Sequence, residues 1–210
     1  MKKCIDDIDV YYTVKSAVRN AIKVKSSDFI ASVIPVSNIE QANNELSKIR
    51  TEFYDASHNC FAYKIGAKGD MYRYSDDGEP SGSAGKPIYF AIGKFNYTDI
   101  LVIVTRFFGG TKLGVGGLVR AYGDAAESAI QLCTKEAIYL TDTFEISCEY
   151  TDVSTIKRLI ADVSIESSET YSENVIFKAK IFKSSSDSFI DYIFSSTNGR
   201  ITPVKINEQD

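Results

Sequence analysis

The feature that most constrains the fold is an apolar run followed directly by a glycine-rich segment. Residues 100–104 are all apolar, and five of the thirteen glycines lie within residues 109–117. The apolar run predicts a buried central strand, and the helical spacing of apolar residues after Gly117 predicts a helix. The glycines therefore connect a strand to a helix. Backbone N–H groups converge at such a junction and attract anions.

Three cations accompany these glycines and indicate what the segment could bind. We predict a phosphate or nucleic-acid site formed by the loop backbone and by charged side chains, because each charge-assisted hydrogen bond contributes about 1.5–3 kcal/mol. The alternative is that the glycines permit positive-φ turns and close packing of the helix on the sheet. The spacing matches neither the P-loop nor the dinucleotide-binding fingerprint. The predicted site comprises Arg106, Gly109, Gly110, Lys112, Gly114, Gly116, Gly117 and Arg120.

The net charge of −4 is unevenly distributed along the 210 residues. Residues 1–140 contain 17 Lys or Arg and 16 Asp or Glu, a balance of +1, whereas residues 141–210 contain 7 and 12, a balance of −5. A chain that is acidic overall is not expected to bind polyanions over its whole surface. Any nucleic-acid contact is therefore expected from a local patch in the first part.

Several features of the sequence predict a cytosolic location. The first residues contain no apolar segment of the kind that a secretory signal has, and no stretch approaches the roughly 18 apolar residues that span a membrane. The four cysteines are far apart and the chain has one histidine, so neither structural zinc nor disulfides are expected. We expect reduced cysteines, no metal, no cofactor and no membrane contact.

The apolar periodicities divide the chain into two α+β domains. In the first, residues 17–35 predict two strands joined by a short turn, and residues 59–74 predict a hairpin. Ser37 and Glu40 form a capping box that begins a helix. A further short helix is expected at residues 83–93, with its proline in the first turn. Together with the central strand, these elements predict one domain over residues 1–138.

The second part of the chain has the order strand, helix, strand, strand, helix, strand. This order is that of the ferredoxin-like fold, so we predict a smaller ferredoxin-like βαββαβ domain over residues 142–210. Asp152 is expected to cap its first helix. The strands are expected at residues 144–150, 165–171, 175–182 and 200–206, and the helices carry apolar faces at residues 153–163 and 189–194.

A polar loop before the short helix contains three carboxylates within four residues. They could bind Mg²⁺ or act as an acid–base pair. Equally, the serines and glycines of the loop could cap a helix and hold an anion. A third alternative is a surface loop in which the carboxylates cap turns or pair with Arg73. We predict that this loop is shaped by Asp76, Asp77, Glu79, Ser81, Ser83 and Lys86.

The histidine lies two residues before a cysteine. In a strand His58 and Cys60 would face the same side, so the two could form a nucleophilic pair. Cys60 also begins an apolar strand, where a packed thiol is common. We expect no catalytic residue here, and we expect His58 and Asn59 to shape the loops through hydrogen bonds.

Taken in order, three segments resemble the YigZ/IMPACT family closely. Residues 55–60 match the family's histidine–asparagine–cysteine strand, and residues 76–87 match its aspartate–aspartate–glycine–glutamate–proline loop. Residues 104–122 match its loop of arginine, an aromatic residue, phenylalanine and two glycines. The combination is far more specific than any one motif. The resemblance covers roughly residues 15–135, and the acidic second part looks like the C-terminal module of the bacterial members.

This resemblance implies a fold and a field of activity. The first domain should have the fold of the second domain of ribosomal protein S-five, and the second should look like the ferredoxin-like fifth domain of elongation factor G. Both relationships point toward translation and RNA. The eukaryotic IMPACT relatives regulate translation initiation with a further N-terminal partner-binding domain, to which the resemblance does not extend. Their specific role is therefore not implied.

We expect a translation regulator that binds RNA or a ribosome-associated partner, and we favour a protein that is not an enzyme. One alternative is a phosphate-dependent enzyme or nucleotide-binding protein that uses the glycine-rich loop and the acidic loop. Another is a protein-interaction module that uses the aromatic residues around Phe107, Phe108 and Tyr122. The sequence predicts no oligomeric state.

Overall fold

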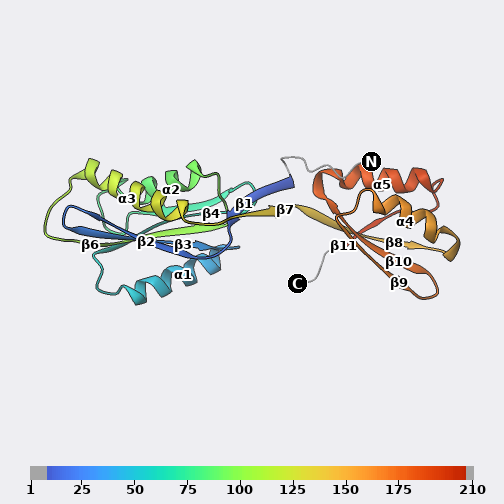
Figure 1. Cartoon of the computed structure of the whole chain (residues 1–210), viewed down its shortest axis with the longest axis horizontal. Helices are drawn as coiled ribbons and strands as arrows, with labels where there is room; N and C mark the ends of the chain where they lie inside the picture. Colours follow the sequence, from blue (N-terminus) through green and yellow to red (C-terminus); the bar gives the residue numbers. More distant parts are fainter. Residues whose placement is uncertain (1–8, 207–210) are drawn as a thin grey trace. The chain divides into compact units, whose positions relative to one another are not determined.

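The apolar run forms strand β6 (Ile100–Phe107) at the centre of a five-stranded sheet in a computed structural model, which describes residues 9–206. Its side chains are buried on both faces in alternation. Ile100, Val102 and Val104 belong to one core cluster, and the two residues between them belong to another. Helices lie on both sides of the sheet and cover these faces (Figure 1). The predicted central strand is confirmed.

The five strands follow the order β2–β3–β6–β4–β5, and every neighbouring pair is antiparallel. The other four strands are β2 (Val18–Val24), β3 (Ser27–Pro35), β4 (His58–Ile65) and β5 (Met71–Ser75). Helix α1 (Ile39–Glu52) covers one face, and α2 (Gly85–Lys94) and α3 (Val115–Gln131) cover the other (Figure 1). Both predicted hairpins and the three predicted helices of this part are confirmed.

The described chain divides into two compact units, each with its own core. One unit is residues 11–138, and the other contains residues 139–206 together with residues 9 and 10. Strands β1 (Val10–Val14) and β7 (Lys135–Tyr139), which the sequence pattern does not indicate, form a separate two-stranded sheet. The segment used to argue against a secretory signal, and the outer limits of the two predicted domains, lie outside the described residues.

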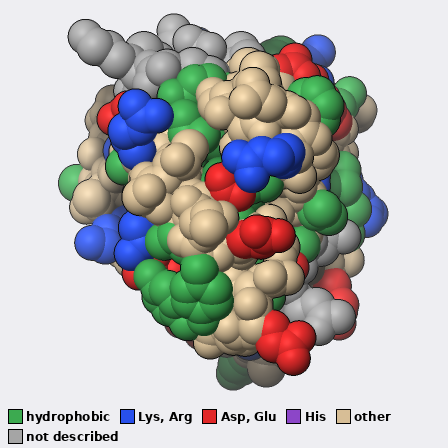
Figure 2. Space-filling view, turned by 90° about the vertical axis from the view of Figure 1, so that its right-hand side faces the viewer, with side chains coloured by type: hydrophobic (Ala, Val, Ile, Leu, Met, Phe, Trp, Pro, Cys, Tyr) green, Lys and Arg blue, Asp and Glu red, His purple; other side chains and the backbone are tan. Residues whose placement is uncertain are grey.

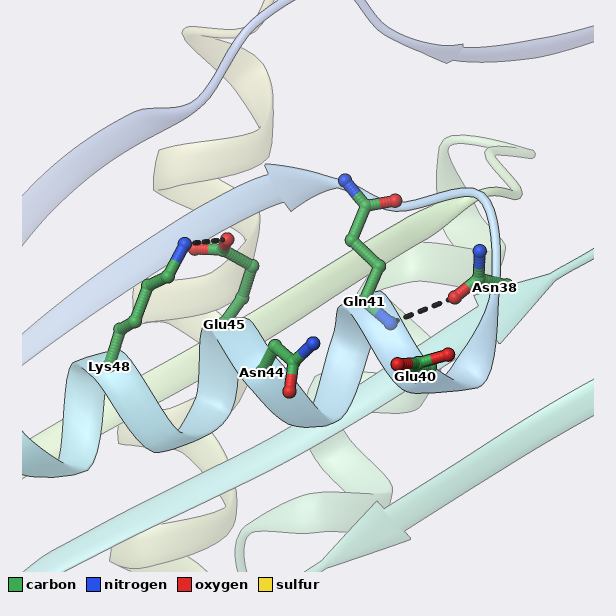
Figure 3. A pocket seen from close by; sticks show the side chains of 6 residues that line it. All are labelled: Asn38, Glu40, Gln41, Asn44, Glu45 and Lys48. Carbon is green, nitrogen blue, oxygen red and sulfur yellow. Dashed lines mark hydrogen bonds and ion pairs between the residues drawn. The ribbon is translucent and has the colours of Figure 1, made fainter.

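The cap of α1 is shifted by one residue from its predicted position. Asn38 is the N-cap: its backbone is extended (φ −154°, ψ 169°), and its Oδ1 accepts a hydrogen bond from the Gln41 N–H at 2.8 Å (Figure 3). Gln41 Oε1 in turn accepts one from the Ser37 N–H at 2.8 Å. The capping box of Ser37 and Glu40 is therefore wrong, because the chain turns helical one residue later. An open polar depression on this helix is lined by Asn38, Glu40, Gln41, Asn44, Glu45 and Lys48 (Figure 3).

The second unit is a βαββαβ module with a four-stranded antiparallel sheet in the order β11–β8–β10–β9. The predicted ferredoxin-like order is confirmed. In Figure 2, which looks onto this unit, acidic and basic side chains are interspersed with hydrophobic ones. Its elements are β8 (Thr141–Cys148), α4 (Val153–Ala161), β9 (Glu166–Tyr171), β10 (Val175–Phe182), α5 (Ser186–Ser196) and β11 (Val204–Ile206).

Asp152 occupies the N-cap position of α4, as predicted, but its side chain does not act as the cap. It ends a short 3-10 turn (Tyr150–Asp152) with helical backbone angles (φ −94°, ψ −9°), and its side chain makes no capping hydrogen bond. Its carboxylate instead accepts two hydrogen bonds from Arg200, at 2.8 and 2.9 Å. The last strand was predicted from residue 200, but it begins only at Val204, so Arg200 lies before it.

Candidate functional site

Three loops that are far apart in the sequence meet at one end of the five-stranded sheet. Because neighbouring strands are antiparallel, β6 ends where β4 and β3 begin and where β5 ends. In this register Arg106 lies opposite both His58 and Phe29. The motifs at residues 55–60, 76–87 and 104–122 are thereby brought together on the side of the sheet that α2 and α3 cover.

Asp76 closes the acidic loop onto the N-terminus of α2. Its Oδ1 accepts hydrogen bonds from the N–H groups of Ala84 and Gly85, both at 2.9 Å, and its Oδ2 accepts one from Gly82 at 2.8 Å. Burial opposes ionisation of this carboxyl, but the three backbone N–H groups outweigh it and lower the pKa of Asp76 below its ordinary value. A protein carboxylate thus occupies the position where an external anion would bind α2.

Asp77 positions His58 and the start of β4. Its carbonyl oxygen lies 2.8 Å from His58 Nδ1, and because a carbonyl only accepts, this nitrogen carries a proton. The Asp77 carboxylate accepts a hydrogen bond from the Asn59 N–H at 2.7 Å and pairs with Arg50 at 2.7 Å. His58 Nε2 is 4.0 Å from Glu79 Oε1. The histidine is therefore held in one orientation by the acidic loop.

A buried ion pair lies beneath the loops. The side chains of Glu79 and Arg106 are only 3% and 7% exposed, and Arg106 Nη1 donates to Glu79 Oε1 at 2.6 Å. The same oxygen accepts a hydrogen bond from the hydroxyl of fully buried Tyr122 at 2.7 Å. Burial is the main cause that raises the pKa of Tyr122, so the phenol remains a donor. These contacts tie the acidic loop, β6 and α3 together.

The Arg106 side chain is buried and is surrounded by other groups of the protein. Its guanidinium lies 5.5 Å from the ring centroid of Phe29 and 5.3 Å from that of Phe108, and its Nη2 donates to Ser27 Oγ at 3.5 Å. Its Nε is buried and has no hydrogen-bond partner within residues 9–206. Glu79 neutralises its charge, so Arg106 holds the loops together rather than presenting a free cation to solvent.

Cys60 has the surroundings of a packed thiol. It is fully buried, and its Sγ donates to the Asp76 carbonyl oxygen at 3.0 Å. Burial above all raises the pKa of this thiol to about 12; a hydrogen bond with Tyr122 opposes the shift, and the nearby carboxylates add to it. The thiol is therefore protonated at neutral pH and is not an activated nucleophile.

Close packing explains the first glycine of the glycine-rich loop. A Cβ on Gly109 would lie 1.5 Å from the Ser26 carbonyl oxygen, so no larger residue fits without moving the backbone. The N–H groups of Phe108 and Gly109 donate to Ser57 Oγ and Ser27 Oγ, at 3.1 and 3.3 Å. These two donors already have protein partners. At this end of the loop the glycine is required by its close packing against the Ser26 backbone.

The other end of the loop leaves the N-terminus of α3 open. Gly114 (φ +72°) is the N-cap, no side chain caps the helix, and its first turn contains no acidic residue. The first hydrogen bond within α3 is the one that the Leu118 N–H donates to the Gly114 carbonyl. The N–H groups of residues 115–117 come before it and have no acceptor within the helix. Lys112, two residues before the cap, and Arg120, in the second turn, are exposed. The helix dipole and both cations favour an anion here.

The remaining predicted residues lie near the start of α2. Ser81 is exposed, whereas Ser83 is fully buried and its Oγ has no hydrogen-bond partner in the part of the chain that the structure describes. Lys86 Nζ lies 5.6 Å from the ring centroid of Phe90. Across residues 9–206 no group of three or more His, Cys, Asp or Glu side chains is placed to hold a metal ion. In the same part of the chain no helix is long and apolar enough to cross a membrane.

Sequence reasoning missed three residues on which the site depends. Tyr122, which only the alternative of a protein-interaction module placed on an aromatic face, is fully buried against Phe29 with ring centroids 5.1 Å apart. Its place on the apolar stripe of α3 was the available signal of burial. Ser27 and Arg50 come from β3 and α1, far from the motifs, and no local pattern connects them to the loops that they contact.

The region of the chain that contains these three loops matches a known protein family. The model of the Impact N-terminal domain matches residues 25–130, which include all three loops. The chain is 35% identical to the IMPACT family member YvyE of Bacillus subtilis over 191 residues, 90% of this chain and 88% of the relative. It is 37% identical to the IMPACT family member YigZ of Escherichia coli over 141 residues, 66% of this chain and 69% of the relative.

One solved structure shows the same fold over almost the whole chain. A crystal structure described as that of a hypothetical protein covers 96% of this chain and 99% of its own, with a TM-score of 0.67 and 27% identity. A structure described as the two-domain translational regulator Yih1 covers 58% of this chain and 47% of its own, with a TM-score of 0.35 and 22% identity, which is too low an overlap to indicate a shared function. The family model and the two bacterial relatives, taken with the three converging loops, show that the chain belongs to the IMPACT family.

Proposed function

We propose that this protein regulates translation in the cytoplasm by binding RNA at the open N-terminus of α3. The observation that carries the proposal is a 17-residue helix with no side-chain cap and no acidic residue in its first turn, flanked by exposed Lys112 and Arg120. Membership of the IMPACT family supports it, because the family resemblance implies a role in translation.

The geometry supports contact with the RNA backbone rather than with base edges. A phosphate oxygen at this helix end would accept hydrogen bonds from the free N–H groups of residues 115–117. No heavy atom would lie within 4 Å of a Cβ at Gly110, Gly114 or Gly116, so the backbone is open to a ligand. Phosphate contacts position an RNA without reading its sequence. The buried pair of Glu79 and Arg106 would hold the loop in the receptive conformation.

The three carboxylates of the acidic loop favour this function over an enzyme that holds a metal there. Asp76 caps α2, Asp77 binds Arg50 and the Asn59 N–H, and Glu79 binds Arg106 and Tyr122. Each carboxylate is turned toward a different protein partner. A metal ion would have to displace these contacts.

Fluorescence anisotropy with labelled single-stranded RNA across salt concentrations tests the proposal. We expect salt-dependent binding by the full chain. Lys112→Ala/Arg120→Ala should weaken it and flatten the log–log salt slope by about 1.4, because each phosphate contact on a single strand contributes about 0.7. Arg158→Ala/Lys178→Ala is the matched control: it removes the same charges from exposed positions of the second unit and should leave binding unchanged.

Two further measurements separate the outcomes. In a cell-free translation reaction, the wild-type protein should change the yield, and the Lys112→Ala/Arg120→Ala variant should not. Ribosome co-sedimentation before and after RNase treatment distinguishes RNA from protein: retention after RNase would assign the surface to a ribosome-associated protein instead. Absence of RNA binding at low salt, or equal losses in both double variants, would contradict RNA binding at α3.

A further inference from the structure

We infer that an aromatic platform on α2 and β5 stacks the unpaired bases of a single-stranded RNA. The platform consists of Tyr72 and Tyr74 on β5 and of Tyr89 and Phe90 on α2. This inference rests on the proposed RNA binding and adds to it a second contact, which reads base surfaces where the α3 site contacts phosphate. None of these four residues belongs to the motifs at residues 55–60, 76–87 and 104–122.

The platform is built from an edge strand and the helix that packs over it. β5 is the last strand of the sheet, and its alternate residues Tyr72 and Tyr74 point to the same face. Their ring centroids lie 5.1 and 5.8 Å from that of Tyr89 on α2, and Phe90 lies 6.3 Å beyond it. The four rings therefore form one continuous cluster, held from two elements.

Three of the four rings are largely open to solvent. Tyr72 is 56% exposed, Tyr74 is 43% exposed and Phe90 is 60% exposed. Tyr89 is partly buried and forms the centre of the cluster. Exposed rings of this kind present π-faces, on which nucleic-acid bases stack without regard to sequence.

The charge around the platform suits a polyanion. β5 and α2 contain no acidic residue at all, in a chain with a net charge of −4. Lys86 lies against Phe90 at the rim, and Lys64 is the cross-strand partner of Tyr72, so its stem starts on the same face. An apolar protein partner would need no such cations. Aromatic rings interleaved with cations are typical of surfaces that bind single-stranded nucleic acid.

The position of the rings favours RNA over an extended peptide, which is the other natural partner of an edge strand. A peptide would add to the free edge of β5 through main-chain hydrogen bonds. The exposed rings, however, lie on the face of the sheet and continue onto a helix, where a peptide added as a sixth strand would not reach them. Bases in a duplex are already stacked and cannot reach these rings either. The geometry thus selects a single strand.

The experiment compares ring-removing variants with a labelled oligo(U), an oligo(A) and an RNA duplex of equal length. Tyr72→Leu/Phe90→Leu keeps apolar side chains but removes two π-faces, and we expect it to lose at least about 10-fold in affinity for both single strands. The salt slope should stay the same, because stacking releases no counterions. Tyr54→Leu, at a position that is 85% exposed outside the platform, is the matched control and should bind as the wild type does.

Conservative variants and intrinsic fluorescence provide an independent readout. Tyr72→Phe/Tyr74→Phe retains the rings and should retain the affinity. Because the chain has no tryptophan, tyrosine emission is directly visible, and oligo(U) should quench it in the wild type and much less in Tyr72→Leu/Phe90→Leu. Circular dichroism should show the same fold for every variant.

The possible results separate this inference from the function on which it rests. Equal single-strand affinity in the wild type and in Tyr72→Leu/Phe90→Leu would overturn the platform and leave RNA binding at α3 intact. Absence of RNA binding by the wild type would overturn both. Duplex binding that falls by the same factor in the leucine variant, or a loss of affinity in Tyr72→Phe/Tyr74→Phe, would overturn base stacking on these rings.

Discussion

Single carboxylates organise the candidate site, each through a different partner. Asp77 holds His58 and Arg50, whereas Glu79 receives both the Arg106 guanidinium and the Tyr122 hydroxyl. The pair of Glu79 and Arg106 is the most consequential, because both side chains are almost completely shielded from water. A buried pair adds little net stability by itself, yet removal of one partner leaves an uncompensated charge in a medium of low dielectric constant.

Glu79→Gln is therefore expected to destabilise the first unit by about 3–5 kcal/mol, because Arg106 loses its counter-charge. Urea unfolding followed by circular dichroism measures this change. Glu52→Gln removes a carboxylate from an exposed pair with Arg19 and should shift the midpoint little. Glu79→Gln/Arg106→Met should be more stable than Glu79→Gln. Wild-type stability of the single variant would show that the pair does not hold the loops.

The two helices that begin near the site differ in how their N-termini are satisfied. The N-cap of α2 is Ala84, which has no polar side chain, and Asp76 supplies the missing acceptor from eight residues earlier. The N-cap of α3 is Gly114, and no side chain among the described residues caps this helix. Helix dipole and N–H groups are similar in the two helices, so the presence of Asp76 is what makes one end closed and the other open.

Asp76→Asn should destabilise the protein by about 1–2 kcal/mol at pH 7, since the ionised cap of α2 is lost. The pKa of Asp76 is lowered in the folded state, so its contribution is present above the unfolded pKa of about 4 and is lost as the pH falls through the folded value. Urea unfolding at pH 7 and pH 3 should thus show a gap between wild type and variant that narrows in acid. Asp55→Asn, at an exposed position, should show no gap at either pH.

The whole molecule consists of two units whose apolar cores are separate. The first core lies on both faces of the five-stranded sheet, and the second lies between the four-stranded sheet and helices α4 and α5. Sequence charge follows the same division, with the acidic balance carried by the second part. The proposed anion site accordingly lies in the first unit. Separate cores of this size commonly unfold as separate cooperative blocks.

Calorimetry should resolve two unfolding transitions that respond to different substitutions. Phe177→Ala removes a buried ring from the second core and should cost that unit about 3–5 kcal/mol without moving the other transition. Ile103→Ala, in the first unit, should have the reciprocal effect, at about 2–5 kcal/mol. A single transition that both variants lower together would show that the units unfold as one.

The elements that could be predicted are those whose signal is local. The alternating burial of β6 and the apolar stripes of the helices follow from side-chain periodicity, which is read directly from residues a few positions apart. The cap of α1 was displaced by one residue because Ser37 and Asn38 are both suitable N-caps. Strands β1 and β7 were not predicted. Each is only five residues long, and the two partners are separated in the sequence by most of the first unit.

The sequence alone determined the order of the elements other than β1 and β7, the two-domain α+β plan and the family, because these depend on periodic patterns and on motifs that stand in the chain itself. Only the tertiary structure decided which of the groups predicted to bind an anion already have protein partners. Arg106 is neutralised by Glu79 from 27 residues away, and the N-terminus of α2 is filled by Asp76. The end of α3, with Lys112 and Arg120, remains open. Availability depends on partners that the fold brings together, and no local pattern records them.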